Sequence, residues 1–311
     1  MKRRHLLALS GAVASSPGFA QAKPRIGFLA AGDPEPTWTL FRRAMADLGY
    51  IEDRTVKYEY RAATERERLD AFAAELVRLE VDVIVAFLSP AIAAAQRATS
   101  RVPIVFNGAA PETGVVSNVA RPEANITGAF SPSSTVAGKG IQLFHEMKPT
   151  TKAIGVLLNA NDPFHVPLLQ GIETVGRAER IEIVPVLIQS PDALAQAFEA
   201  LAQRGVDSVL IQPSLGFAPT VALALKLRLP AFSFRREFAE AGGLFAYGAD
   251  QAEINRAVAS SVDRILKGAR PGDLPVQQAS RFELVINQKT AKVLEFVLPP
   301  LFLARADEVI E

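Results

Sequence analysis

The chain has 311 residues, of which 49% are hydrophobic and none is cysteine, and its formal net charge is +1. This length suits two domains of ordinary size better than one core. The lack of cysteine excludes disulfides, thiolate metal sites, a cysteine nucleophile and a lipid anchor on an N-terminal cysteine. A charge so close to zero argues against a dedicated nucleic-acid or membrane-surface binder, so no nucleic-acid partner is expected.

Residues 1–22 have the pattern of a secretory signal peptide. Lys2–Arg4 forms a basic segment, Leu6–Ala14 an apolar segment too short to span a bilayer, and Ala20–Ala22 a small-residue cleavage site. A frayed N-terminal helix is the alternative interpretation. We expect an exported protein whose mature form begins near Lys23 and is soluble in the periplasm, with the Sec and twin-arginine routes both open.

Short apolar runs then alternate with segments of helical spacing. The expected strands are 26–31, 56–60, 81–87 and 103–106, and the main expected helices are 38–48 and 65–77. The second of these helices carries an apolar stripe that includes Leu69, Phe72 and Leu76. Continuous apolar strands that alternate with helices predict an α/β fold, in which helices cover both faces of a parallel sheet.

The same order of elements returns further along the chain. The matching segments are 26–29 with 154–157, 81–85 with 206–210, and 103–105 with 230–232. In the register that aligns Val81 with Val206, Ser214 corresponds to Ser89 and Leu201 to Leu76. Three strands recurring in one order predict two similar doubly wound parallel-sheet lobes.

Three crossings between the lobes are expected, and together they would allow hinge closure on a ligand. The candidate segments are 121–128, which is bounded by proline and glycine, then 243–250 and 274–282. A helix over 253–267 separates the last two. The first lobe would then contain residues 23–124 and 250–275, and the second lobe residues 129–245 and 280–311.

Common catalytic motifs are missing from the sequence. It contains no dinucleotide-binding G-x-G-x-x-G, no P-loop and no G-x-S-x-G elbow. Its histidines are His5, His145 and His165, and isolated histidines are more often surface or capping residues than metal ligands. We therefore predict no catalytic residue, no metal site and no cofactor, which favours binding over turnover.

Several segments together carry a family resemblance that covers essentially the whole mature chain. The segments of the C-terminal third are quite specific. The matching segments include Ser89–Ala91, Asn125–Gly128, Arg236–Phe238, Glu240–Leu244, Tyr247–Asp250, Asp263–Gly268, Asp273–Gln278, Phe282–Asn287 and Leu303–Asp307. They resemble the ABC-transporter substrate-binding family of the tryptophan/tyrosine type, which has the type I periplasmic-binding-protein fold.

The resemblance implies a non-enzymatic protein that captures a small solute between two lobes and delivers it to an ABC permease. The implied partners are the permease membrane subunits and a small-molecule ligand, with an amino acid, an aromatic compound or a carboxylate as candidates. A monomer is expected. One departure is that the loop Asn107–Pro111 lacks the aspartate that family members usually carry there, a natural partner for a ligand ammonium group. Aromatic amino-acid specificity is therefore not carried over.

Ligand contacts are expected at the carboxyl ends of the strands, where the two lobes face each other. The candidates in the first lobe are Asp33, Trp38, Ser89, Pro90, Asn107 and Gly108. Those in the second lobe are Asn159, Asp162, Phe164, Ser214, Phe234 and Arg235, and Asp250 is a candidate from the hinge.

Most of these residues also have a purely structural interpretation. Ser89 could cap a helix, Trp38 could belong to the core, and Asp162 could shape an Asp-Pro turn. Arg235 could clamp a ligand carboxylate, and its neighbour Arg236 would then face solvent or a helix end. Two alternative functions stay open as well, a periplasmic ligand sensor for a membrane signalling protein and a metal-independent α/β enzyme that uses the same cleft.

Overall fold

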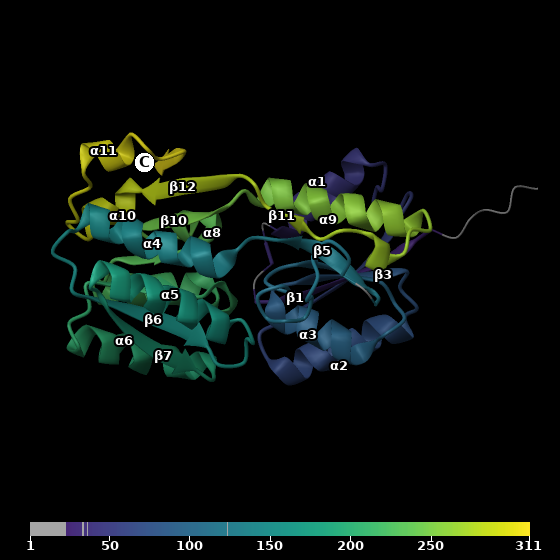
Figure 1. Cartoon of the computed structure of the whole chain (residues 1–311), viewed down its shortest axis with the longest axis horizontal. Coiled ribbons are helices and arrows are strands. Elements are labelled where there is room, and N and C mark those ends of the chain that lie inside the picture. Colours follow the sequence, from purple (N-terminus) through teal and green to yellow (C-terminus); the bar gives the residue numbers. More distant parts are fainter. Residues whose placement is uncertain (1–22, 33, 36, 123) are drawn as a thin grey trace, which may run out of the picture.

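Two lobes, each built around its own β-sheet, lie side by side in the computed structural model (Figure 1). The structure describes residues 23–311 except Asp33, Pro36 and Glu123, so the predicted signal peptide and the candidate Asp33 lie outside the described residues. None of the helices in the described ranges combines the length and hydrophobicity needed to cross a membrane.

The first lobe contains a six-stranded parallel sheet with strand order β11-β5-β4-β3-β1-β2. Its strands are β1 (Arg25–Ala31), β2 (Lys57–Ala63), β3 (Val83–Phe87), β4 (Ile104–Asn107), β5 (Ile126–Phe130) and β11 (Gln277–Gln278). Helices α1 (Thr37–Asp47) and α9 (Gln251–Leu266) pack together in one apolar layer, and α2 (Arg66–Arg78) and α3 (Ser89–Ala98) form the other. A 3₁₀ turn at Pro271–Asp273 follows α9.

The second lobe contains a seven-stranded sheet with strand order β13-β12-β10-β9-β8-β6-β7, parallel except where β10 meets β12. Its strands are β6 (Ala153–Asn159), β7 (Glu182–Ile188), β8 (Ser208–Ile211), β9 (Ala231–Ser233), β10 (Phe245–Ala249), β12 (Phe282–Asn287) and β13 (Glu308–Ile310). The helices are α4 (Ser133–Met147), α5 (His165–Glu179), α6 (Leu194–Gln203), α7 (Phe217–Lys226), α8 (Arg236–Glu240), α10 (Gln288–Val293) and α11 (Pro300–Leu303), with 3₁₀ turns at Pro191–Ala193 and Pro213–Leu215.

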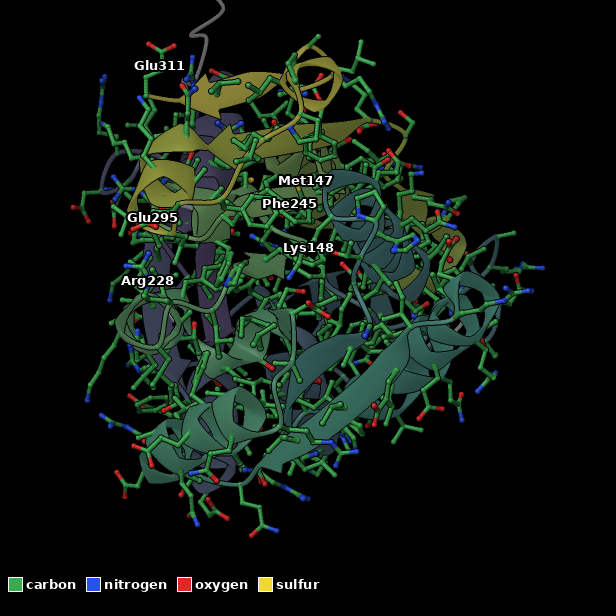
Figure 2. All side chains as sticks on the ribbon, turned by 90° about the vertical axis from the view of Figure 1, so that its left-hand side faces the viewer. Met147, Lys148, Arg228, Phe245, Glu295 and Glu311 are labelled. Atoms are coloured by element: carbon green, nitrogen blue, oxygen red, sulfur yellow. The ribbon has the colours of Figure 1, made fainter. Side chains whose placement is uncertain are left out.

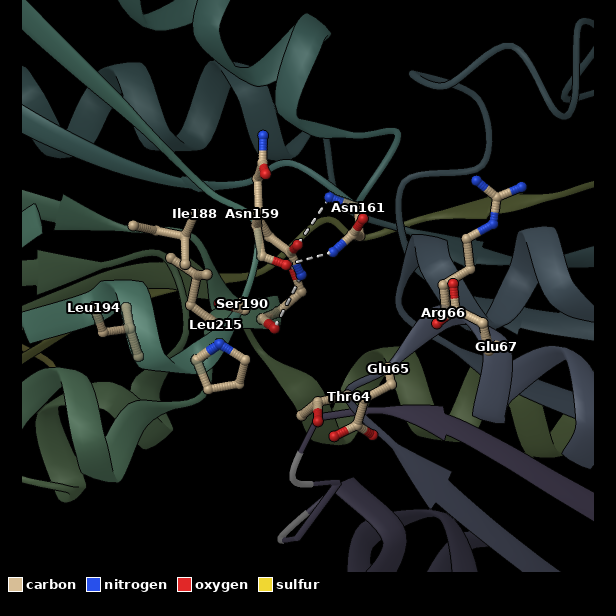
Figure 3. Close-up of a pocket in the computed structure, with 13 residues that line it drawn as sticks. Thr64, Glu65, Arg66, Glu67, Asn159, Asn161, Ile188, Ser190, Leu194 and Leu215 are labelled. Carbon is tan, nitrogen blue, oxygen red and sulfur yellow. Dashed lines mark hydrogen bonds between the residues drawn. The ribbon is translucent and has the colours of Figure 1, made fainter.

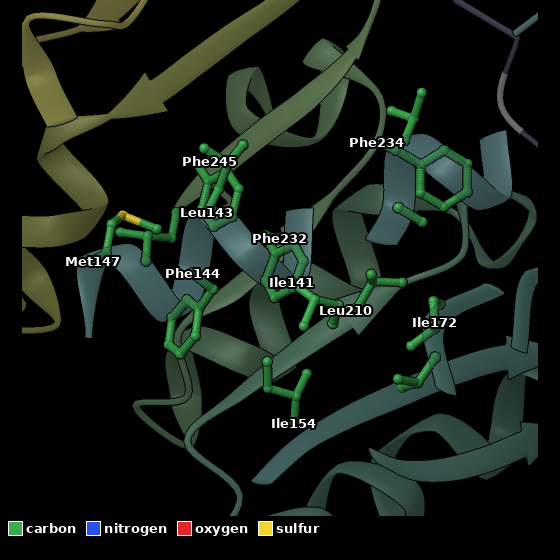
Figure 4. Close-up of a cluster of buried hydrophobic side chains, with 14 of the residues drawn as sticks. Ile141, Leu143, Phe144, Met147, Ile154, Ile172, Leu210, Phe232, Phe234 and Phe245 are labelled. Carbon is green, nitrogen blue, oxygen red and sulfur yellow. The ribbon is translucent and has the colours of Figure 1, made fainter. Parts of the chain in front are cut away.

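Stacked phenylalanines form the centre of the larger core of the second lobe. The ring of Phe232 on β9 lies 4.8 Å from that of Phe245 on β10 and 5.8 Å from that of Phe144 on α4 (Figure 4). Offset stacking at these distances stabilises beyond the apolar area that is buried. At the outer end of the lobe, Arg228 and Glu295 form an exposed ion pair at 2.9 Å, while Phe245 lies inside (Figure 2).

The two lobes share their internal packing, as the repeat in the sequence predicts. Gly27 on β1 lies under Leu76 of α2, and a Cβ atom at Gly27 would be 3.1 Å from that leucine. Gly155 on β6 lies under Leu201 of α6 in the same way, at 2.8 Å. Glycine at these two positions lets a helix approach its sheet closely. The predicted fold class, two similar α/β lobes, is confirmed.

Within the described residues, the chain passes between the lobes at three places. The first connection is Ser131–Pro132, between β5 and α4, and the prediction of a first crossing at 121–128 is therefore wrong. The predicted start of the second lobe at residue 129 is wrong for the same reason, because Ile126–Phe130 is a strand of the first sheet. Gly128 permits this pairing, since a Cβ there would lie 2.3 Å from the carbonyl oxygen of Phe106.

The other two connections are Asp250, between β10 and α9, and Ala279–Arg281, between β11 and β12. The Asp250 amide donates to the carbonyl of Arg281 at 3.0 Å, and the Ala279 amide donates to the carbonyl of Phe130 at 2.8 Å. All three connections therefore lie close together on one side of the molecule, which is the arrangement that a hinge requires.

Candidate functional site

A small cavity, which we call the inner chamber, lies between the two lobes at the carboxyl ends of their central strands. Its volume is about 40 Å³. Eight of the candidates predicted from the sequence line it, namely Ser89, Asn107, Gly108, Asp162, Phe164, Ser214, Phe234 and Arg235. They come from both lobes. Ser89 and Ser214, which correspond to each other in the sequence repeat, both line this cavity.

Four other candidates do not line the inner chamber, and three of them, Trp38, Pro90 and Asp250, hold structural positions elsewhere. Trp38 is buried in the first-lobe core, with its ring 4.8 Å from that of Phe28. Pro90 is buried in the first turn of α3, where its fixed φ suits a helix start. Asp250 caps α9, accepting hydrogen bonds from the amides of Ala252 at 2.8 Å and Glu253 at 3.2 Å. In this structure the three residues serve in packing, helix initiation and capping, and their expected ligand contacts stay predictions.

Hydrogen bonds join the polar residues on the second-lobe wall. The carboxylate of Asp162 accepts from the Gln212 side chain at 2.8 Å, the Ser214 hydroxyl at 2.6 Å and the Phe164 amide at 2.9 Å. Asp162 is only 3% exposed, and this burial raises the pKa of its carboxyl, an effect that the three hydrogen bonds only partly offset. The Asp-Pro turn therefore also carries a carboxylate that lines the chamber.

Two side chains on the first-lobe wall have polar atoms without a hydrogen-bond partner among the described residues. They are the amide nitrogen of Asn107, at the end of β4, and the amide oxygen of Gln251, at the start of α9. Both residues are more than nine-tenths buried. Buried polar atoms are nearly always paired, so an unpaired donor and an unpaired acceptor on two residues that line one cavity indicate a site for a polar ligand.

Gln251 and Gln212 are absent from the sequence-based candidates. Gln251 directly follows the helix-capping Asp250, and Gln212 follows the apolar strand β8. A polar residue at the carboxyl end of a strand is a signal that could have found Gln212. Gln251 could not be found so easily, because its position depends on where the chain returns to the first lobe.

The start of α3 borders the inner chamber next to Asn107. Leu88, the residue before the helix, has a φ of +66°, which is rare for a residue with a side chain. This conformation turns the chain sharply from β3 into the helix at Ser89. The first amides of α3 have no partner within the helix, and the helix dipole favours negative charge at this end.

Arg235 crosses from the second lobe to the first. Its guanidinium donates to the Thr37 hydroxyl at 2.7 Å and lies 5.0 Å from the centre of the Phe87 ring, both in the first lobe. It also forms two hydrogen bonds with Glu237 of its own lobe, at 2.9 and 3.2 Å. Arg236 instead pairs with Glu240 and Glu283, away from the chamber. Arg235 therefore ties the two lobes together where they meet.

A second cavity, the outer chamber, lies beside the inner one and has a volume of about 270 Å³ (Figure 3). The first lobe contributes Thr64–Glu67, the segment that leads into α2, and the second lobe contributes the ends of β6 and β7 and the start of α6. The candidate Asn159 lies here instead of in the inner chamber. Its amide donates to the carbonyl of Ser214 at 3.3 Å, and Ser214 lines both chambers.

The profile of the family described as ABC transporter substrate binding protein matches residues 38–310. A tyrosine-binding protein of Clostridioides difficile is 24% identical over 263 residues, which cover 82% of this chain and 75% of that protein.

Solved structures of similar fold include a conserved domain protein from Vibrio cholerae, with a TM-score of 0.85, 25% identity and coverage of 92% of this chain and 99% of that one. Another is the ABC domain from Streptococcus pneumonia in complex with L-Trp, with a TM-score of 0.84, 22% identity and coverage of 93% and 100%. These likenesses agree with the two-lobed fold described above.

Proposed function

Because this chain belongs to the family of ABC transporter substrate-binding proteins, we propose that it binds a free amino acid in the inner chamber and delivers it to an ABC permease. The observation that carries the proposal is the pair of unpartnered atoms on Asn107 and Gln251. A buried polar group without a partner costs about 1–3 kcal/mol, and a ligand that pairs with both atoms would recover that free energy.

The charges around the chamber support a zwitterionic ligand. The Asn107 amide and the start of α3 would receive the ligand carboxylate, since helix N-termini and amide donors both favour anions. The carboxylate of Asp162, across the chamber, would receive the ammonium group. Asp162 therefore offers, from the second lobe, the negative charge that the loop after β4 lacks.

The relatives support the same ligand class. One is described as tyrosine-binding and another was solved with L-Trp, and both ligands are amino acids. The proposal also includes export to the periplasm, action as a monomer and transfer of the solute to permease subunits. Family membership and the signal-like N-terminus support these parts. Residues of both lobes line the chamber, so ligand would favour the closed arrangement of the lobes.

Titration calorimetry on the mature protein would test this proposal. We expect at least one amino acid to bind, while its decarboxylated amine and its deaminated acid bind at least tenfold more weakly. Asn107→Ala should weaken binding, and Asn118→Ala, in an exposed loop that does not line the chamber, should leave binding unchanged. Absence of binding by every amino acid would overturn the proposal, and equal binding of the amine would overturn the assigned carboxylate site.

A further inference from the structure

The outer chamber is much larger than the inner one and has an aliphatic floor. Its volume is about 270 Å³, against about 40 Å³ for the inner chamber. The floor consists of Ile188, Leu194 and Leu215, of which the first two are only 3% and 5% exposed. These residues belong to or pack against the apolar core between the second sheet and α6. A cavity with such a floor suits an apolar group.

Both lobes border this chamber. The first-lobe side is the exposed segment Thr64–Glu67 (Figure 3). No aromatic ring lines the chamber in the part of the chain that the structure describes. The second lobe therefore offers aliphatic side chains together with polar ones, and the first lobe offers a polar edge. Neither wall offers an aromatic ring on which a ligand ring could stack.

Ser214 connects the two chambers. Its hydroxyl donates to Asp162, which lines the inner chamber, while its carbonyl accepts from Asn159, which lines the outer chamber. A ligand whose charged head lies beside Asp162 would have to pass Ser214 to reach the outer chamber. The inner chamber alone is too small to hold more than a short head group.

On the premise of the proposed function, we propose that the outer chamber is a subsite for a long aliphatic side chain. The ligand would be an unbranched aliphatic amino acid, with its carboxylate and ammonium groups in the inner chamber and its hydrocarbon chain on Ile188, Leu194 and Leu215. The aliphatic floor and the lack of a stacking surface separate this ligand class from the aromatic amino acids in the descriptions of the relatives.

Calorimetry with a chain-length series tests this subsite. The probes are L-alanine, L-norvaline, L-norleucine and L-2-aminooctanoic acid, with L-phenylalanine and L-tryptophan as aromatic comparisons. We expect the Kd to fall about fourfold for each added methylene until the chamber is full. Norleucine should also bind more tightly than either aromatic amino acid.

Two substitutions that fill the chamber give a matched test. Ser190→Trp, from the second lobe, and Thr64→Trp, from the first, change exposed residues that line the outer chamber. Each should reduce the affinity for norleucine to about that for alanine and leave alanine binding unchanged. Ser100→Trp, at an exposed serine outside both chambers, should alter neither.

The outcomes separate the two proposals. If alanine binds but the affinity is flat or falls with chain length, or if an aromatic amino acid binds more tightly than norleucine, the subsite proposal is overturned and the proposed function stands. If no amino acid binds, both are overturned. If Ser190→Trp and Thr64→Trp both bind norleucine as tightly as the wild-type protein does, the subsite proposal is also overturned.

Discussion

Asp82 in the first lobe and Asp207 in the second hold the beginning of a central strand in the same way. The Asp82 carboxylate accepts from the Arg25 amide at 2.7 Å, before β3 and at the start of β1. The Asp207 carboxylate accepts from the amides of Lys152 and Ala153 at 2.7 and 3.1 Å, before β8 and at the start of β6. With the Gly27 and Gly155 contacts, these bonds show that the two lobes share a scaffold down to individual atoms.

Although the two lobes share this scaffold, the polar side chains on the two walls of the inner chamber differ in their hydrogen bonding. On the second-lobe wall, Asp162, Gln212 and Ser214 form a hydrogen-bonded set. On the first-lobe wall, Asn107 and Gln251 each keep an unpartnered atom. The repeat therefore preserves the strands and their packing, whereas the polar residues at the strand ends differ between the lobes. One wall is already ordered by its own bonds, and under the proposed function a ligand would complete the other.

The largest effects should come from the shared packing. Leu76→Ala and Leu201→Ala each remove the leucine that covers a strand glycine, and each should lower the free energy of unfolding by about 2–5 kcal/mol. Urea unfolding followed by circular dichroism measures both. Similar losses would support equivalent lobes, whereas a loss below about 1 kcal/mol in only one variant would contradict the shared scaffold.

The asparagines of the two lobes should respond in opposite ways. Asn159→Ala removes hydrogen bonds to Ser214 and Asn161 and should lower stability by about 1–3 kcal/mol. Asn107→Ala removes a side chain with an unpartnered donor, so it should keep the stability of the unliganded protein and weaken amino-acid binding at least tenfold. Thermal unfolding and calorimetry measure the two quantities. Normal binding by Asn107→Ala would refute the asymmetry.

A smaller effect is expected at the contact between the lobes. Thr37→Val removes the hydroxyl that accepts from Arg235, a bond worth about 0.5–1.5 kcal/mol, and should shift unliganded protein towards an open form. Small-angle X-ray scattering should then show a larger radius of gyration. The control is Thr39→Val, whose hydroxyl bonds to Glu35 near the start of its own helix. An equal radius for both variants would count against a role of Arg235 in closure.

The smallest effect is a pH dependence that belongs to Asp162. The pKa of its carboxyl is raised by burial, so the folded unliganded protein holds this proton to higher pH than the unfolded chain does. Its contribution to stability is therefore present below the unfolded pKa and is lost as the pH rises through the folded pKa.

Asp162→Asn removes this titration. The Tm of the variant minus the Tm of the wild-type protein should increase as the pH rises from below the ordinary carboxyl range to neutrality. The altered hydrogen bonds would add a difference in Tm that does not depend on pH. Thermal unfolding across that range measures the difference. A Tm difference that does not change with pH would mean that Asp162 titrates as in the unfolded chain.

The repeated strands could be predicted from the sequence, because their apolar runs and the spacing of Leu76 and Leu201 are local patterns. The position of the first crossing could not be predicted in this way, because a strand bounded by proline and glycine has the pattern of a linker until its neighbour in the sheet is known. The role of Gly128 depends on Phe106, more than 20 residues earlier. The contact of Arg235 with Thr37 was beyond reach for the same reason, since it joins residues 198 positions apart.

The buried position of Trp38 gives this protein a built-in optical probe. It is the only tryptophan in the sequence, so the intrinsic indole emission reports on the first lobe alone. Its neighbour Thr37 accepts the hydrogen bond from Arg235, and the guanidinium of Arg42 lies 5.5 Å from the indole ring. Separation of the lobes would change the charges near the fluorophore, and stopped-flow fluorescence of unlabelled protein could then time the motion of the hinge.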